Sequence, residues 1–248
     1  MNMKDYKKLS EMIYKRKSVR AFSKKPADIL DNDIDLIKTF ELTPLIDNIK
    51  VLIKVLKKSE VKNDRSNYCI AFYTEDKPLS LENIGFLGQQ LELELQLKGL
   101  GTCWWGMKKP KKDYKKIDSM ECVITMTVGY PQKEESRVYP DGFSRKPAKD
   151  IMIGNKESDK FIEAVRIAPS AVNLQPWLIE KINKQYDFYL RPPKTIIEKM
   201  IPDMRRIDMG IAMAHMFVQA KADNLNVSFK FEGKDTKFGK FTGSIIIT

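Results

Sequence analysis

Two long stretches of this chain are apolar on nearly every side of a helix. Residues 81–98 place apolar side chains at 84, 87, 91 and 95, with others at 86, 93 and 97. Residues 208–223 repeat the pattern at 211, 214, 218 and 222, with further apolar positions at 209, 213, 216, 217 and 220. A helix with apolar residues all round is buried in the core of its domain. The pattern therefore predicts two long central helices.

Shorter periodic segments flank both long helices in a similar order. Further helices are predicted over residues 4–15, 33–57, 158–166 and 195–200, and strands over 68–74, 102–106, 122–130, 176–182, 187–190, 227–231 and 244–248. Each half of the chain thus runs helix, helix, strand, long helix, strand. Helices that cover antiparallel or mixed sheets define the α+β class, which is the fold class we expect.

The sequence also repeats itself in three segments. Residues 22–27 return as 143–148, after 121 positions, and residues 43–48 match 168–173, after 125. Residues 85–101 match 210–226, also after 125, with few identities but with Gly near the start of each helix. Three segments in one order are typical of a duplicated unit, although a Lys-rich chain can produce such matches by chance. We expect two halves, residues 1–135 and 136–248.

Charge and composition exclude several classes of protein. The 248-residue chain has a net charge of +11, but its lysines are spread over the whole length and no nucleic-acid-binding motif accompanies them. The charge is then mostly a solvated surface that favours anionic ligands, and no nucleic-acid partner is expected. No segment has the apolar run of a secretory signal or a membrane span. Three cysteines without metal-ligand spacing indicate reduced thiols, so we expect a cytoplasmic protein with no metal site and no membrane partner.

Residues 168–177 (APSAVNLQPW) join a short predicted helix to a predicted strand. Their small side chains let a bulky planar group approach the backbone, while Pro169 sets the bend and Pro176 ends any helix. Ser170 and Asn173 offer uncharged hydroxyl and amide groups to the polar edge of a ring. An ordinary turn after a helix would use the same residue types.

Two other segments are candidates for binding an anionic, ring-containing ligand. Residues 16–20 (RKSVR) place three cations and a hydroxyl within five positions, and arginine supplies a planar fork for phosphate. A basic helix end would have the same composition. Residues 99–106 (GLGTCWWG) contain glycines that let backbone amides approach a ligand, followed by aromatic residues that can wall a ring. They also fit a helix end that leads into a buried strand.

Together these segments resemble the FMN-dependent nitroreductase family. The resemblance rests on residues 16–22, 99–104 and 168–177, and on residues 128–131 followed by 144–147, which look like that family's closing strand and basic tail. It implies a nitroreductase-like α+β fold and a flavoprotein with FMN as its cofactor. It also implies that FMN lies at a subunit interface, since members are usually homodimers. One subunit then gives the basic and Gly-Leu-Gly segments, and the other gives the Pro-Ser-x-x-Asn loop.

The order of these motifs departs from the usual family pattern. There the Pro-Ser-x-x-Asn loop soon follows the basic segment, whereas here residues 43–48 (TPLIDN) stand at that position and the intact loop comes in the second half. The second half in turn has Arg137 and Tyr139 opposite Arg16 and Ser18 and has lost the basic segment. The chain therefore resembles the duplicated, single-chain subgroup of nitroreductase-like proteins, an intramolecular pseudo-dimer. We expect one flavin per chain, a decayed mirror site, and a monomer in preference to a homodimer.

The resemblance implies a role for each candidate residue. The phosphate or ribityl chain would be contacted by Arg16, Ser18 and Arg145. The N1–C2=O edge, where a cation raises the flavin reduction potential, would be contacted by Lys17 and Arg20. The two faces of the ring would be covered by small, apolar and loop residues, namely Leu100, Gly101, Pro169, Ser170, Ala171 and Asn173. No catalytic side chain is expected, because flavin N5 does the chemistry, and the single histidine, His215, is expected to be a core residue.

The function implied is that of an FMN oxidoreductase. It would take hydride from NAD(P)H and pass it to a small-molecule acceptor such as a nitroaromatic or a quinone. The alternative is a flavin-binding carrier or sensor without nitroreductase turnover, which the decayed mirror site makes plausible.

Overall fold

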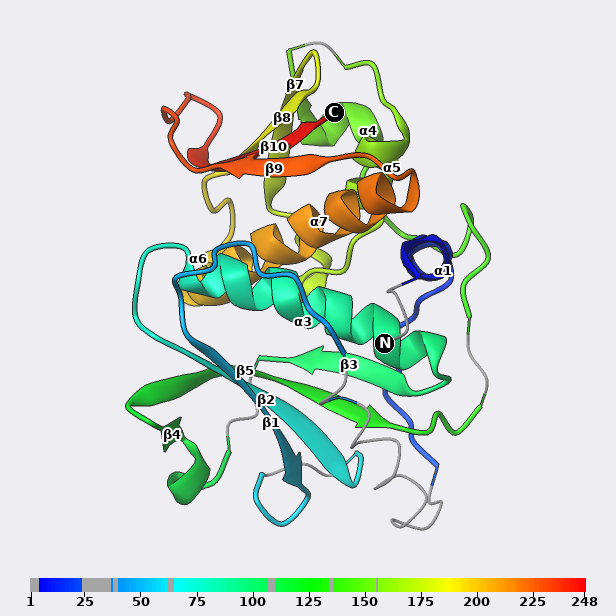
Figure 1. The fold of residues 1–248 in the computed structure, drawn as a ribbon, viewed down its shortest axis with the longest axis vertical. Helices are drawn as coiled ribbons and strands as arrows, with labels where there is room; N and C mark the ends of the chain where they lie inside the picture. Colours follow the sequence, from blue (N-terminus) through cyan, green and yellow to red (C-terminus); the bar gives the residue numbers. More distant parts are fainter. Residues whose placement is uncertain are drawn as a thin grey trace.

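Two sheets enclose a central pair of long helices (Figure 1). The computed structural model describes residues 5–23, 37, 40–61, 65–106, 110–133, 136–154 and 156–248. The paired helices are α3 (Ser80–Leu97) and α7 (Pro202–Ala222), which pack along each other. Most of their residues are buried, as their all-round apolar pattern predicts. No helix in the described ranges is long and apolar enough to cross a bilayer.

The first sheet is antiparallel and comes from the first half of the chain. Its strands lie in the order β1 (Val51–Lys57), β2 (Tyr68–Thr74), β5 (Met120–Gly129) and β3 (Gly101–Trp105). A short β4 (Lys116–Ile117) follows the 3-10 turn η2 (Lys112–Tyr114) and also pairs with β5. Every residue of β2 is buried, which fits its aromatic and β-branched composition. This sheet packs one face against α3.

The second sheet comes from the second half and follows the same path. Its strands lie in the order β6 (Met152–Ile153), β7 (Trp177–Ile182), β8 (Gln185–Leu190), β10 (Lys240–Ile247) and β9 (Val227–Lys230). The strands β7, β8, β9 and β10, taken in chain order, occupy the same relative places as β1, β2, β3 and β5. The other elements of the second half are α4 (Ala148–Ile151), α5 (Lys160–Arg166), η3 (Ala171–Asn173) and α6 (Ile196–Met200). The α+β class is confirmed by this arrangement.

The crossing of α3 and α7 depends on two glycines. A Cβ atom on Gly85 would collide with the backbone carbonyl of Ile207, and one on Gly210 with the carbonyl of Glu82. Gly210 follows Gly85 by 125 positions and Ile207 follows Glu82 by the same number, so one contact is the counterpart of the other.

Helix α1 (Tyr6–Ile13) leads the basic segment to the first sheet. Its N-cap, Asp5, accepts a hydrogen bond from Lys8 N at 3.1 Å, and Ser10 Oγ donates to Gln219 Oε1 of α7 at 2.9 Å. After the helix, Val19 N donates to Thr102 O at 2.8 Å, so the chain runs beside β3. Residues 16–20 are thereby fixed next to the end of α3.

The predicted helix over residues 33–57 is wrong in its last part. Residues 51–57 form β1, which pairs with β2 in continuous register from Val51 opposite Thr74 to Lys57 opposite Tyr68. The segment VLIKVLK contains apolar residues at helical as well as strand spacing, and a buried partner strand decides for the sheet. Residues 40–50 contain no helix, and residues 24–36 and 38–39 lie outside the described residues. The short elements α4, β4 and β6 were not predicted.

Candidate functional site

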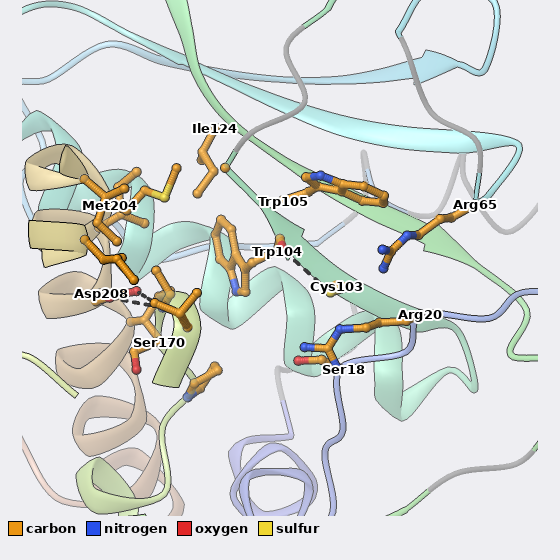
Figure 2. Close-up of a pocket in the computed structure, with 18 residues that line it drawn as sticks. Ser18, Arg20, Arg65, Cys103, Trp104, Trp105, Ile124, Ser170, Met204 and Asp208 are labelled. Atoms are coloured by element: carbon orange, nitrogen blue, oxygen red, sulfur yellow. Dashed lines mark hydrogen bonds between the residues drawn. The ribbon is translucent and has the colours of Figure 1, made fainter. Parts of the chain in front are cut away.

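A cavity of about 400 Å³ lies between the first sheet and the beginning of α7 (Figure 2). We call it the inter-half pocket, because both halves of the chain supply its walls. The first half contributes Ser18, Arg20, Arg65, Cys103, Trp104, Trp105, Gly106 and Ile124. The second half contributes Pro169, Ser170, Ala171, Val172, Ile197, Ile201, Met204, Ile207, Asp208 and Ile211. Most of this lining is apolar, with cations on one side only.

The cationic side of the pocket is formed by Arg20 and Arg65. Figure 2 shows the Arg20 guanidinium beside Ser18 and the Arg65 guanidinium near Trp105, both on the opposite side of Trp104 from Ser170 and Asp208. The Arg65 guanidinium lies 4.1 Å from the centroid of the Trp105 ring, in cation–π geometry. Two arginines beside an apolar, aromatic cavity suit a planar ligand that carries negative charge at one edge or end.

The opposite wall is the loop that contains η3. Its backbone is unusual, because Val172 has φ of 42° and Asn173 has φ of 60°. Ser170 Oγ accepts a hydrogen bond from Gln175 N at 2.9 Å, and Ala171 N donates to both carboxyl oxygens of Asp208, at 3.0 and 3.1 Å. The loop is therefore braced from inside and from α7.

Asn173 is held away from the pocket by the basic tail. Its Oδ1 accepts from Arg145 Nη1 at 2.8 Å, and its Nδ2 donates to Ser144 O at 2.9 Å. Arg145 also donates from Nε to Ala168 O at 3.0 Å. Burial, together with the nearby charges of Arg16 and Arg137, lowers the pKa of Arg145 to about 9, so it remains charged at neutral pH. Arg145 and Asn173 thus brace both ends of the loop.

Arg16 lies directly behind Ser18. Its side chain is fully buried and its Nη2 is 3.3 Å from Glu92 Oε1, a carboxylate that is also fully buried. The same Nη2 donates to Ser18 Oγ at 3.0 Å. In the described part of the chain, Arg16 Nε and Nη1 have no hydrogen-bond partner. Arg16 is therefore one hydrogen bond removed from the pocket.

The other sequence-predicted residues support the basic segment. Lys17 N donates to Gln96 Oε1 at 3.1 Å, and Gln96 Nε2 donates back to Lys17 O at 3.2 Å. Leu100 is buried, and a Cβ atom on Gly101 would collide with the side chain of Val19. The structure thus brings five predicted residues into the pocket: Ser18, Arg20, Pro169, Ser170 and Ala171. Six others do not line it: Arg16, Lys17, Leu100, Gly101, Arg145 and Asn173.

Several pocket residues are not evident from the sequence. Arg65 belongs to no motif. Ile197 of α6 and Met204 of α7 line the pocket because the chain passes beside it between these two helices. Trp104 and Trp105 of the aromatic run after the glycines line the pocket, whereas Trp177 is fully buried in the core. His215 is buried in α7, where its Nδ1 lies 2.9 Å from Ala164 O and burial lowers its pKa to about 3.

Comparison with protein families identifies the chain. Residues 8–220 match the model of the family described as "Putative TM nitroreductase". The chain belongs to this nitroreductase family. The family expected from the sequence motifs is thereby confirmed, and membership supports an oxidoreductase in general.

The chain is also similar to several solved structures. A putative nitroreductase from Thermotoga maritima MSB8 matches with a TM-score of 0.64 at 22% identity, over 96% of this chain and 93% of that one. A nitroreductase family protein from Clostridium difficile 630 matches with a TM-score of 0.43 at 17% identity, over 64% and 100% of the two chains. An FMN-dependent nitroreductase from Clostridium difficile R20291 gives 0.40 at 13% identity, over 54% and 93%. No curated protein sequence matches significantly. The first of these structures establishes the nitroreductase-like fold.

Proposed function

We propose that this nitroreductase-family chain is an FMN-dependent oxidoreductase that transfers hydride from NAD(P)H to a nitroaromatic, quinone or similar small-molecule acceptor. The observation that carries the proposal is the composition of the inter-half pocket. Ser18 and Arg20 of the basic segment and residues 169–171 of the Pro-Ser loop line one cavity, although about 150 positions separate them in the sequence. These are the two segments whose combination resembles a flavin site.

The pocket residues fit a flavin. Apolar and aromatic walls, including Trp104 and Ile211, suit a flat ring system, and Arg20 with Arg65 suits its anionic parts. Behind Ser18, Arg16 Nε and Nη1 have no hydrogen-bond partner among the described residues, so they could donate to a nearby anion. When bound, the flavin would supply reversible hydride transfer.

The chain's own residues would bind and orient that group. Ser18 offers a hydroxyl, and Arg20 a charged fork, at the polar end of the pocket. The braced loop at Ser170 and Ala171 would hold the ring by contact with one of its faces. Trp104 would limit how far the ring enters the pocket. Apolar side chains at the mouth, among them Val172 and Ile197, would exclude water from the reacting edge.

We further propose that the two halves, residues 1–135 and 136–248, are duplicated units that form an intramolecular pseudo-dimer with one flavin. The equal strand order of the two sheets and the reciprocal Gly85 and Gly210 contacts support this proposal. A pocket that needs the basic segment of one half and the loop of the other would then be complete in a single chain.

The deciding experiment is the visible spectrum of the purified full chain, with released flavin counted per chain. We expect one FMN per chain, bleached anaerobically by NADH or NADPH and restored by a nitroaromatic or quinone. Arg20→Ala and Ser170→Ala should each weaken binding of the same flavin, whereas Lys230→Ala, an exposed change on β9, should not.

Other outcomes of this experiment select other functions. Bound flavin that neither nicotinamide reduces would favour the carrier or sensor alternative, which the pairing of Arg16 with Glu92 makes reasonable. Two flavins per chain would contradict the single-site proposal. No flavin, even after FMN is added, would overturn the flavin function.

A further inference from the structure

The beginning of each long helix holds a loop through one side chain. In the first half, Asn83 Oδ1 accepts hydrogen bonds from Leu45 N at 2.8 Å and Ile46 N at 3.3 Å, and its Nδ2 donates to Ile46 O at 3.3 Å. In the second half, 125 positions later, Asp208 accepts from Ala171 N. Ile46 and Ala171 are separated by the same 125 positions, so the hydrogen bond from Ile46 N to Asn83 corresponds to the one from Ala171 N to Asp208. The amide of Asn83 braces its loop, so bracing alone does not require a carboxyl at position 208. A carboxyl differs from an amide because it can gain or lose a proton.

Asp208 differs from Asn83 in facing a cavity. It is buried, yet it lines the inter-half pocket, where Asn83 has no part. The two carboxyl oxygens share one backbone donor, Ala171 N, which leaves capacity for a further partner. A buried carboxyl with one donor and a cavity beside it is positioned to contact whatever fills that cavity.

Nearby positive charge lowers the pKa of Asp208 less than burial raises it. On its own helix, Arg205 is near, but the Arg205 Nη2 donates to the Arg191 carbonyl. Arg206 pairs instead with Glu82 of α3 at 2.8 Å. Residues 169–172 of the adjacent loop contain no titratable side chain, and the remaining cations of the pocket, Arg20 and Arg65, lie beyond Trp104 (Figure 2). Among the ion pairs of the described residues, none includes Asp208. Burial accordingly raises the pKa of Asp208 to about 8.

We propose that Asp208 is a specificity-determining residue of the inter-half pocket, where its protonated carboxyl donates a hydrogen bond to an acceptor oxygen of a planar ligand. The inference rests on the proposed function for the choice of ligand. Carbonyl oxygens of the flavin ring and the oxygen atoms of a nitroaromatic or quinone acceptor share this chemistry. The carboxyl accepts from Ala171 N with one oxygen and donates through the other, so it selects ligands that present an acceptor towards α7.

The protonation state is tested first, on the full chain without ligand. A carboxyl whose pKa is higher in the folded than in the unfolded chain stabilises the fold least at high pH. The wild type should lose stability relative to Asp208→Asn as the pH rises from about 4 to 8, and the difference should then level off. Urea unfolding of both proteins at each pH measures this difference. Parallel pH profiles would overturn the proposal, because they would mean that Asp208 is ionised in the fold.

Ligand binding tests the hydrogen bond itself. Asp208→Asn keeps an acceptor for Ala171 N and offers an amide N–H to the ligand, but it does not ionise. We expect wild-type affinity for FMN, followed by flavin fluorescence, to fall about tenfold from pH 6 to pH 9, since one pH unit above the pKa leaves about a tenth of the groups protonated. The variant should keep similar affinity at both values. The control is Asn83→Asp, which places a carboxyl at the counterpart position and should leave the binding profile as in the wild type.

Two titrations separate the possible ligands and the possible failures. If FMN binding loses the pH dependence in Asp208→Asn, the flavin ring is the partner. If only 4-nitrotoluene binding to the FMN-loaded protein loses it, the electron acceptor is the partner. If both ligands bind with equal pH dependence in wild type and variant, the proposal is overturned. Failure of FMN to bind any of the proteins would overturn the flavin function, while the unfolding profiles would still decide whether Asp208 is protonated.

Discussion

At the scale of single residues, the pocket depends on one position with an unfavourable backbone. Val172 has φ of 42° at the tip of the loop, in the left-handed region that β-branched residues rarely adopt. Its side chain is 72% exposed, so little apolar burial offsets the cost. Such strain persists where the surrounding contacts over-determine the backbone, and it is concentrated at functional sites. Here those contacts are the hydrogen bonds of Ser170, Ala171 and Asn173.

Replacing this valine should stabilise the chain. Asn tolerates the left-handed region, so Val172→Asn should raise the free energy of unfolding by about 1 kcal/mol. Chemical denaturation measures the change. The matched control is Val138→Asn, which alters a valine with 73% exposure and no positive φ and should be near neutral. A loss of stability in Val172→Asn beyond that of the control would contradict the strain argument.

The buried pair of Arg16 and Glu92 has a different energetic character. Both charges are desolvated, so removing one leaves the other uncompensated inside the core. We expect Arg16→Met to reduce the free energy of unfolding by about 3–5 kcal/mol, and the double change Arg16→Met, Glu92→Leu to cost less than the two single changes together.

The control for this pair lies on α1. Glu11 and Lys15 are mostly exposed and 3.9 Å apart, so Glu11→Gln should produce no measurable change. Thermal and urea unfolding of all four variants give the comparison. Equal losses for Arg16→Met and Glu11→Gln would mean that the buried pair is not coupled.

At the scale of elements, the close approach of α3 and α7 determines how the halves fit together. The backbone of each helix occupies the space that a Cβ of the other would need, at Gly85 and Gly210. This crossing fixes where β3 and the η3 loop lie relative to each other, because β3 follows α3 and the η3 loop contacts α7. The shape of the pocket between them therefore depends on the absence of a Cβ atom at Gly85 and at Gly210.

Gly→Ala changes at this crossing should destabilise the chain in spite of a better helix propensity. Alanine is favoured over glycine by about 1 kcal/mol in an unconstrained helix. Gly85→Ala and Gly210→Ala should each lower the free energy of unfolding by about 3 kcal/mol, because overpacking would force the helices apart. Gly88→Ala, whose added Cβ meets the Trp104 side chain and not backbone, should cost less. A stabilised Gly85→Ala or Gly210→Ala would show that the helices separate easily.

At the scale of the whole molecule, we propose that one chain is sufficient to form the flavin site. Both walls of the cavity come from one chain, and the apolar surfaces of α3 and α7 are already buried against each other. We expect the protein to sediment as a 28.7 kDa monomer and to bind its flavin in that state. Sedimentation velocity with simultaneous flavin absorbance measures both properties. Flavin found only in a dimeric fraction would contradict the pseudo-dimer proposal.

The sequence predicted the long elements well and the pocket in part. The all-round apolar pattern of α3 and α7, and the aromatic strand β2, left few alternatives, so these elements were located to within a few residues except at the start of α7. The strand β1 was mistaken for helix, because seven residues with apolar side chains at both spacings carry no periodic preference of their own. Arg65 and Met204 could not be assigned, because no motif relates them to the segments that they meet in the fold.

The sequence alone determined the family, the α+β class and the two segments that meet at the pocket, because these depend on local residue types and their spacing. Tertiary structure decided which side chains face the cavity. It turned Arg16 towards Glu92, and it placed Arg20 and Arg65 on the opposite side of Trp104 from Asp208 (Figure 2). Orientation of this kind follows from the packing of β3, α7 and the η3 loop around one another. Those contacts join residues far apart in the sequence, such as Ser18 with Thr102 and Ala171 with Asp208, so no local pattern encodes them.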